Sequence, residues 1–165
     1  MSVAKSMIEN KESEQQVKGP LAEFAARLAE EFGVRLDETS ILRLKDGTLT
    51  FLHPEELGRL MSIPVSCTKN VAGRTAFTRQ SEMHNNFVNV PHLDVFENLR
   101  PRGANKEIPR TIQKLMSVPV VRGNEVIGIL QICRKADTPF AAGPDFSARD
   151  LYRLETLAKT ASHLL

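Results

Sequence analysis

The sequence predicts an α+β fold, with an antiparallel β-sheet at its centre and helices on both faces of that sheet. The main observation is Leu115–Cys133, LMSVPVVRGNEVIGILQIC, in which two apolar runs flank a short polar break. A break of this kind that contains glycine is typical of a β-hairpin. Thr39–Leu52 predicts a second hairpin around Asp46-Gly47, and an amphipathic helix is predicted towards each end of the chain. Together these elements indicate a layered α+β domain.

The composition limits the class of protein. The chain has 165 residues, of which 41% are hydrophobic and 25% are charged, and its net charge is +2. These values favour one globular domain, placed at residues 19–165, and disfavour a nucleic-acid-binding protein. Because no signal peptide and no apolar run of about 20 residues is present, we expect a cytoplasmic protein without a membrane span. Cys67 and Cys133 lie far apart, which predicts free thiols, no metal site and no cofactor.

The N-terminal part of the chain divides at residue 18. Residues 1–18 are polar with nearly balanced charges, and two interpretations remain open: a frayed tail, or a helical extension that packs only in a dimer. Gly19-Pro20 then predicts the start of a helix, because proline suits the first helical turn. An apolar stripe at helical spacing supports this helix, and Gly33 is suited to end it. The stripe consists of Leu21, Phe24, Ala25, Leu28, Ala29 and Phe32.

Several segments of the middle region lack a helical pattern. Residues 53–58 are interpreted as a loop or short turn, and Arg59–Ser66 as a strand that Pro64 confines to a sheet edge or a strand end. Residues 80–114 are irregular, and a long irregular segment within a compact domain is either mobile or functional. Within it, Arg100–Lys114 is basic but has no interleaved aromatic residues, so we interpret it as a solvated loop.

Two short helices are predicted in the same region. Asn70 is a suitable N-cap for a helix over Val71–Arg79, in which we expect Val71 and Phe77 to be buried. A second short helix is predicted over His92–Leu99. These helices and the irregular segment would cover one face of the sheet, and a loose cover of this kind is where we expect a cavity.

The C-terminal part of the chain predicts a loop and a long helix. Arg134–Asp145 contains prolines and a glycine and is interpreted as the loop. The helix is predicted to begin near Ala148, because Ser147 and Asp150 form a variant of the capping box. We expect this helix and the N-terminal helix to share the face of the sheet opposite the cavity.

Three stretches of the sequence resemble the GAF domain family, and together they cover about residues 20–165. Ile63–Gln80 is similar to a family strand followed by a "Gly-x-Ala-Gly-x-Ala" helix start, present here as Asn70-Val71-Ala72-Gly73-Arg74-Thr75-Ala76. Val118–Gln131 is similar to the family's "VPL…GxxIGVLQ" hairpin, and Phe146–Asp150 to its "F-T-x-x-D" start of the last helix. The resemblance implies a central antiparallel sheet of about six strands with helices on both faces. It also implies a small-molecule pocket and a homodimer formed through terminal helices.

The sequence departs from three specialised groups of this family. The cyclic-nucleotide motif "Asn-Lys…Phe-x-x-x-Asp-Glu" reads Arg134-Lys135…Phe146-x-x-x-Asp150-Leu151, so its Asn and Glu are missing. The Cys-His pair of bilin-binding members is absent, because Cys67 precedes Thr68 and Cys133 precedes Arg134. The members that reduce free methionine sulfoxide group several cysteines around the pocket, whereas only Cys67 lies near the expected pocket rim here.

We predict a small-molecule pocket between the sheet and its irregular cover. Aromatic and aliphatic side chains would shape the cavity, and Arg74 and Gln131 would supply polar contacts. The predicted pocket residues are Phe51, Cys67, Arg74, Phe77, Phe87, Phe96, Met116, Val118, Gln131 and Cys133.

Each chemically interesting residue also has a structural interpretation. Cys67 precedes a helix start, where the helix dipole favours a thiolate, but the sequence favours a buried small hydrophobe at this position. Arg74 would hold an anionic ligand or form an ordinary ion pair. The polar stretch Ser81–Asn89 would orient a ligand or form a turn. No carboxylate lies at a spacing from His84 or His92 that indicates acid–base catalysis.

The sequence therefore predicts a non-enzymatic sensor that binds an unidentified small molecule and acts as a homodimer. Because the chain ends directly after its last helix, at Leu165, we expect it to signal in trans to a separate protein. Two alternatives remain: a thiol enzyme that reduces free methionine sulfoxide, and a ligand-free module for dimerisation or protein interaction.

Overall fold

A six-stranded sheet with the strand order β3-β2-β1-β6-β5-β4 forms the centre of the computed structural model. The structure describes residues 19–66, 69–90 and 111–165. All pairs of neighbouring strands in this sheet are antiparallel. The strands are β1 (Thr39–Lys45), β2 (Thr48–His53), β3 (Ser62–Pro64), β4 (Glu82–His84), β5 (Ile112–Arg122) and β6 (Glu125–Lys135).

The two predicted hairpins are present, and their turns explain why they form. Asp46 and Gly47 join β1 to β2 with φ values of 51° and 72°, a conformation that Asp-Gly adopts readily in two-residue turns. Gly123, with φ of 60°, has the same function between β5 and β6. Because β1 pairs with β6, the two hairpins lie side by side in one continuous sheet.

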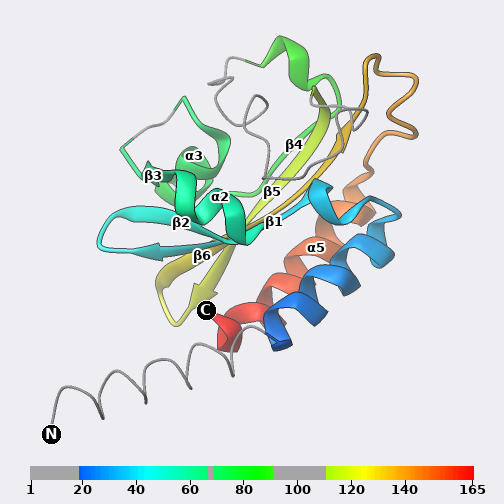
Figure 1. The fold of residues 1–165 in the computed structure, drawn as a ribbon. Helices are drawn as coiled ribbons and strands as arrows, with labels where there is room; N and C mark the ends of the chain where they lie inside the picture. The colour runs from blue at the N-terminus through cyan, green and yellow to red at the C-terminus, as the bar shows by residue number, and fades with distance from the viewer. Residues whose placement is uncertain (1–18, 67–68, 91–110) are drawn as a thin grey trace, which may run out of the picture.

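Two long helices cover one face of the sheet (Figure 1). The N-terminal helix, described over residues 19–32, lies beside α5 (Ala148–Ala161), which is followed by the short helix η3 (Ser162–Leu164). The capping box of α5 is formed as predicted, with the Ser147 side chain accepting from the Asp150 N–H. The apolar stripes of both helices pack on the sheet in one continuous core, which includes the fully buried Leu28 and Leu154.

Shorter elements cover the opposite face (Figure 1). They are α2 (Glu55–Leu60), α3 (Val71–Thr78) and the single turn η2 (Phe87–Asn89), whereas the turn η1 (Leu36–Glu38) connects the N-terminal helix to β1. Asn70 caps α3 as predicted, because its side chain accepts from the N–H groups of Ala72 and Gly73. This face therefore has a cover made of small pieces, as expected from the sequence.

The predicted α+β class, the six-stranded antiparallel sheet, the edge position of the third strand and the shared face of the terminal helices are confirmed. Four local predictions are wrong. Residues 53–58, interpreted as a loop or short turn, include most of the helix α2, and β6 extends into the predicted loop as far as Lys135. Phe77 is 65% exposed, because it lies on the outer side of α3.

The fourth correction concerns Lys114, which was assigned to a solvated basic loop. Lys114 belongs to β5 and is only 5% exposed. Its Nζ donates to Gly143 O and to Asp145 Oδ1, each at 2.7 Å, so this lysine fastens the loop before α5 to the sheet.

Some predictions fall outside the described residues. They concern the N-terminal tail, Cys67 and the helix over His92–Leu99 with Phe96. Among the described helices, none has both the length and the apolar character needed to cross a membrane. Within the same ranges, no group of three or more His, Cys, Asp or Glu side chains could hold a metal ion.

Candidate functional site

The alternation of side chains along β5 and β6 separates the core of the protein from its candidate site. Met116 on β5 and Leu130 and Ile132 on β6 point into the core beneath the long helices. Their neighbours Leu115 and Gln131 face the opposite side of the sheet, as the period of two in a β-strand requires. The same two strands therefore supply both the core and the wall of a cavity.

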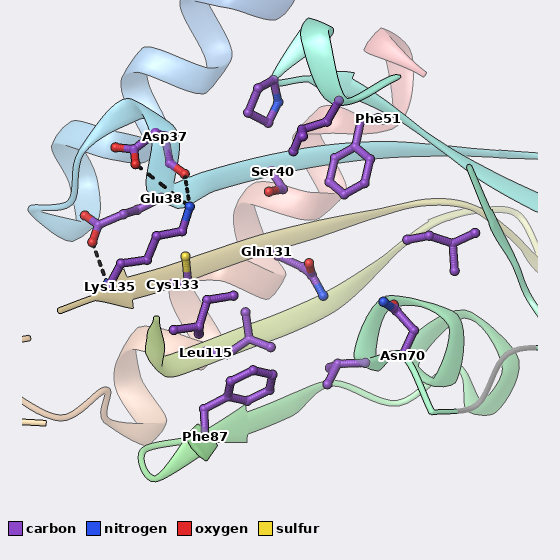
Figure 2. A pocket seen from close by; sticks show the side chains of 15 residues that line it. Asp37, Glu38, Ser40, Phe51, Asn70, Phe87, Leu115, Gln131, Cys133 and Lys135 are labelled. Carbon is purple, nitrogen blue, oxygen red and sulfur yellow. Dashed lines mark hydrogen bonds and ion pairs between the residues drawn. The ribbon is translucent and has the colours of Figure 1, made fainter. Parts of the chain in front are cut away.

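The cavity has a volume of about 80 Å³ and lies between the sheet and its cover of short elements (Figure 2). This volume is several times the ~10–15 Å³ that one buried water requires, so a small organic molecule fits. The described residues that line it are Asp37, Glu38, Ser40, Phe51, Pro54, Leu57, Ile63, Asn70, Val71, Phe87, Ile112, Leu115, Gln131, Cys133 and Lys135.

Two separate apolar clusters flank this cavity. One contains Phe51 and Ile63 with residues of α3, and the other contains Val71, Phe87 and Leu115. Gly58 determines how closely α2 approaches the first cluster, because a Cβ atom at this position would lie 2.2 Å from the backbone oxygen of Phe51. The apolar walls are thus close to the sheet but do not merge into a single core.

Asn70 brings a polar group into the cavity from the start of α3. Its Oδ1 accepts from Ala72 N at 2.9 Å and from Gly73 N at 3.3 Å, so the oxygen is engaged in the helix cap. This arrangement fixes the orientation of the carboxamide and turns its Nδ2 away from the helix. Asn70 is 7% exposed, and among the described residues its Nδ2 has no hydrogen-bond partner.

A chain of hydrogen bonds fixes the side chain of Gln131 in the same cavity. Thr75 donates its hydroxyl proton to Val71 O at 2.8 Å, so Ser117 must donate in the 2.8 Å contact between the two hydroxyls. Ser117 Oγ then accepts from Gln131 Nε2 at 3.2 Å. The carbonyl oxygen of Gln131 therefore remains as an acceptor, and no described residue donates to it.

Charged residues at one end of the cavity compensate one another. Glu38 Oε2 accepts from Arg35 N and Oε1 from Lys135 N, both at 2.7 Å. The Nζ of Lys135 donates to Asp37 O at 3.1 Å and lies 3.8 Å from Asp37 Oδ2. Arg35 Nε donates to Asp37 Oδ1 at 2.9 Å. Two carboxylates and two cations thus form a closed network with no net charge (Figure 2 shows the part that lines the cavity).

Cys133 is the cysteine within the described part of the cavity wall, and it is a poor nucleophile. Burial, with a smaller contribution from the neighbouring Glu38 and Asp37, raises the pKa of the Cys133 thiol to about 12 against the opposing effects of Lys135 and Arg35. The thiolate is therefore almost absent at neutral pH, and the residue behaves as a small apolar side chain.

Arg74 forms an ion pair outside the cavity. Its Nε and Nη2 donate to the two carboxylate oxygens of Glu82 at 2.7 and 2.6 Å, and His84 Nε2 lies 2.7 Å from Glu82 Oε2. Burial alone would raise the pKa of Glu82, but the hydrogen bonds from Arg74 and His84 outweigh burial and hold that pKa below its usual value. This cluster joins α3 to the edge strand β4.

The structure brings together four of the predicted pocket residues, namely Phe51, Phe87, Gln131 and Cys133. It places Met116 and Val118 in the core on the other side of the sheet, Phe77 at the surface and Arg74 in the ion pair with Glu82. Cys67 and Phe96 lie outside the described residues.

The sequence interpretation missed the polar lining other than Gln131. Asn70 was recognised only as a cap, although a cap residue directs its second polar atom away from the helix. Asp37 and Glu38 carried no motif, and Lys135 was considered only in the cyclic-nucleotide motif, because their network joins segments that lie 97 residues apart in the sequence. Ser117 was a usable signal, since it is a lone hydroxyl within an apolar strand.

This fold defines a class of small α+β domains in which an antiparallel sheet separates a helical core from a loosely covered cavity. The sequence profile of the GAF domain family matches residues 20–165, and the chain belongs to this family. GAF domains typically sense small molecules in signalling. A search of curated proteins found no match for this chain.

Several solved structures share the fold. The GAF domain of a phosphoenolpyruvate-protein phosphotransferase from Acinetobacter is 18% identical, with a TM-score of 0.65 over 90% of this chain and 80% of that one. A type II free methionine-R-sulfoxide reductase from Thermoplasma acidophilum is 16% identical, with a TM-score of 0.61 over 91% and 92%. The GAF domain of a two-component sensor histidine kinase from Bacillus halodurans is 18% identical, with a TM-score of 0.56 over 86% and 90%. At these identities, the similarity concerns the fold alone.

Proposed function

We propose that this GAF domain is a non-enzymatic sensor that binds a small molecule in the cavity between the sheet and the short helices. The observation that carries the proposal is the mixed lining of the cavity, in which apolar walls surround a few oriented polar groups. Asn70 and Gln131 are the central examples, because the surrounding hydrogen bonds fix both carboxamides. A cavity of this type is suited to binding and orienting a ligand.

The chemistry of the cavity supports binding rather than catalysis. Cys133 has a pKa near 12, and Glu38 is engaged by two backbone N–H groups, so neither side chain is suited to act as a nucleophile or a base at neutral pH. The methionine sulfoxide reductase with the same fold makes that activity the alternative to test.

The outer surfaces of the long helices support a homodimer. Ala22 and Ala26 are exposed one turn apart on the N-terminal helix, and small residues permit close helix approach. This surface also carries Glu23 and Glu30 with Arg27, whereas the outer surface of α5 carries Arg149 and Lys159. A twofold dimer in which each N-terminal helix packs on α5 of the partner would pair these opposite charges.

We further propose that this dimer binds a separate signalling protein in the cytoplasm, and that this interaction depends on whether the cavity holds its ligand. The free, buried thiol of Cys133 is in keeping with a reducing compartment.

Native mass spectrometry of freshly purified protein tests the sensor and the dimer together. We expect a dimer that retains extra mass from a small molecule, and dissociation to monomers for the charge-reversal variant Arg149→Glu combined with Lys159→Glu. A bare monomer that also reduces free methionine sulfoxide in a thioredoxin-coupled assay would overturn the proposal in favour of the enzyme. A dimer that never binds a small molecule would leave only a dimerisation module.

A further inference from the structure

We infer that the cavity selects an uncharged ligand with an amide-like edge, namely a carbonyl acceptor next to an N–H donor, attached to a small apolar body. This inference rests on the proposed sensing function and specifies the chemical class of its ligand. Three properties of the cavity carry it: a donor on Asn70 and an acceptor on Gln131 that both lack a partner among the described residues, and a charged network with no net charge.

The donor is the Nδ2 group of Asn70. The residue is 7% exposed, and its Oδ1 is engaged by two backbone N–H groups of α3. Among the described residues, no acceptor is paired with its N–H groups. Because Asn70 lines the cavity and its Nδ2 is not a fully enclosed atom, a ligand carbonyl or a water in the cavity would pair with this donor.

The acceptor is the Oε1 atom of Gln131. The bonds from Thr75 to Val71 O and from Ser117 to Thr75 require that Gln131 donates to Ser117 through Nε2, so the carbonyl end cannot be exchanged with the amide end. Figure 2 shows the nitrogen of the Gln131 carboxamide on the side towards Asn70 and its oxygen on the far side, so the Asn70 donor and the Gln131 acceptor do not point at one another. A ligand that carries both an acceptor and a donor, as an amide, a lactam or a nucleobase does, is complementary to these two lining groups.

The charged network explains why the ligand is neutral. Among the described residues, Lys135 is engaged by Asp37, and Arg74 is paired with Glu82 outside the cavity, so neither cation is available to an anion. Glu38 accepts from two backbone N–H groups, so it is not available to an ammonium group. A net charge placed beside these residues would therefore have no partner among them, which is costly in a low-dielectric site.

The apolar body follows from the two clusters that flank the polar pair. Phe51 lies on one side and Phe87 with Leu115 on the other, so a short aliphatic chain or a small ring attached to the amide would contact apolar surface at both ends. The volume of about 80 Å³ limits that body to a few heavy atoms.

The test compares four fragments that differ mainly in the charge and hydrogen-bonding of one group. Butyramide and 2-pyrrolidinone present an amide edge, butyrate an anion and butylamine a cation. Each is titrated into ¹⁵N-labelled full-length protein, and binding is followed on the side-chain amide resonances of Asn70 and Gln131. We expect the two amides to bind at least tenfold more tightly than butyrate or butylamine.

Two variants test whether the preference for amides depends on the Asn70 donor. Asn70→Asp keeps a side-chain oxygen to cap α3 but removes the donor, so we expect at least a tenfold loss of amide binding and a relative gain for butylamine. Asn124→Asp makes the same substitution in the exposed β5–β6 turn and should leave the order of the fragments unchanged.

The outcomes distinguish a failure of the neutral-ligand inference from a failure of the proposed sensing function. Preferential binding of butyrate or butylamine at the same resonances would overturn the neutral-ligand inference while leaving a small-molecule sensor in place. Amide binding that survives Asn70→Asp would also overturn the inference. If none of the four fragments perturbs the Asn70 and Gln131 resonances, the inference is wrong, and the mass retained in native mass spectrometry decides separately whether the sensing function stands.

Discussion

The two faces of the central sheet are built from the same strands but differ in how they are packed. On the helix face, one continuous core joins the N-terminal helix, α5 and the inward residues of β5 and β6. On the cavity face, two smaller clusters lie apart with the cavity between them. The well-packed helix face therefore holds the strands in register, and this leaves the cavity face available for polar side chains.

Buried polar residues have different partners on the two faces. On the helix face, the buried Thr39 donates to Leu36 O and the buried Lys114 donates to the loop before α5, so neither reaches into the apolar cluster. By contrast, Asn70, Thr75 and Ser117 are all buried on the cavity face, where hydrogen bonds connect them to α3 and to Gln131. Buried polar groups of this kind contribute orientation and specificity more than stability.

The largest expected effect comes from truncating neighbouring residues of β5 that point to opposite faces. Met116→Ala removes a fully buried side chain from the continuous core, and we expect a loss of about 3 kcal/mol in the free energy of unfolding. Leu115→Ala removes a side chain that already borders a cavity, so we expect about half of that loss. Urea denaturation of both variants measures the difference, and equal losses would contradict the division between the faces.

A pair of glycines provides the next comparison. At Gly58, a Cβ atom would lie 2.2 Å from Phe51 O, so Gly58→Ala must displace α2 from the cavity wall. At Gly128, a Cβ atom would lie 2.4 Å from Leu42 O and 2.5 Å from a methyl group of Leu165. We expect each variant to lose about 2 kcal/mol of unfolding free energy, and only Gly58→Ala to change fragment binding. Altered binding in Gly128→Ala alone would show that α2 does not shape the cavity.

Most of the fold was predictable because local signals and global packing agree. Asp46-Gly47 and Gly123 mark turns that need positive φ, and Asn70 and Ser147 mark helix starts through their capping oxygens. The helix α2 was missed because its six residues, which include Gly58 and follow Pro54, are too few to show an apolar period.

The site was less predictable because both faces of β5 and β6 are covered. A strand buried on both faces has apolar residues at nearly every position, so its pattern does not reveal which residues share a face. Met116 and Val118 were assigned to the pocket for this reason. Gln131 and Ser117 could have shown which residues of β5 and β6 face the cavity, because a polar residue in such a strand points to the face where it finds polar partners. The charged network around Lys135 depends on tertiary contacts and has no local signature.

The helix caps offer a smaller and more local contrast. Ser147→Ala removes the cap of α5 on the helix face, and Asn70→Ala removes the cap of α3 on the cavity face. We expect each to lower the unfolding free energy by about 1 kcal/mol, as measured by thermal or urea denaturation. Only Asn70→Ala should also abolish amide binding. Asn70→Asp is the control, because it should restore most of the stability without restoring the binding.

The smallest expected effect is the pH dependence of the ion pair between Glu82 and Arg74, which fastens the edge strand β4 to α3. Because the pKa of Glu82 is lowered in the folded protein, its contribution to stability is present above the ordinary value of 4.5 and is lost as the pH falls through the lowered folded value. We therefore expect Glu82→Gln to destabilise the protein by about 0.5–1 kcal/mol at pH 7, with a smaller difference from the wild type below pH 4.5.

Urea denaturation across this pH range measures the contribution of the Glu82 pair, and Glu55→Gln provides a matched control in the pair with Arg59. That pair is more exposed, and we expect its loss to change the unfolding free energy by less than about 0.5 kcal/mol. If Glu82→Gln changed the unfolding free energy as little as Glu55→Gln at every pH, the pairing of β4 with β5 would hold this strand without help from the ion pair. A clear pH-dependent loss would instead show that ion pairs stabilise the cover of the cavity face, where the continuous apolar core of the helix face is missing.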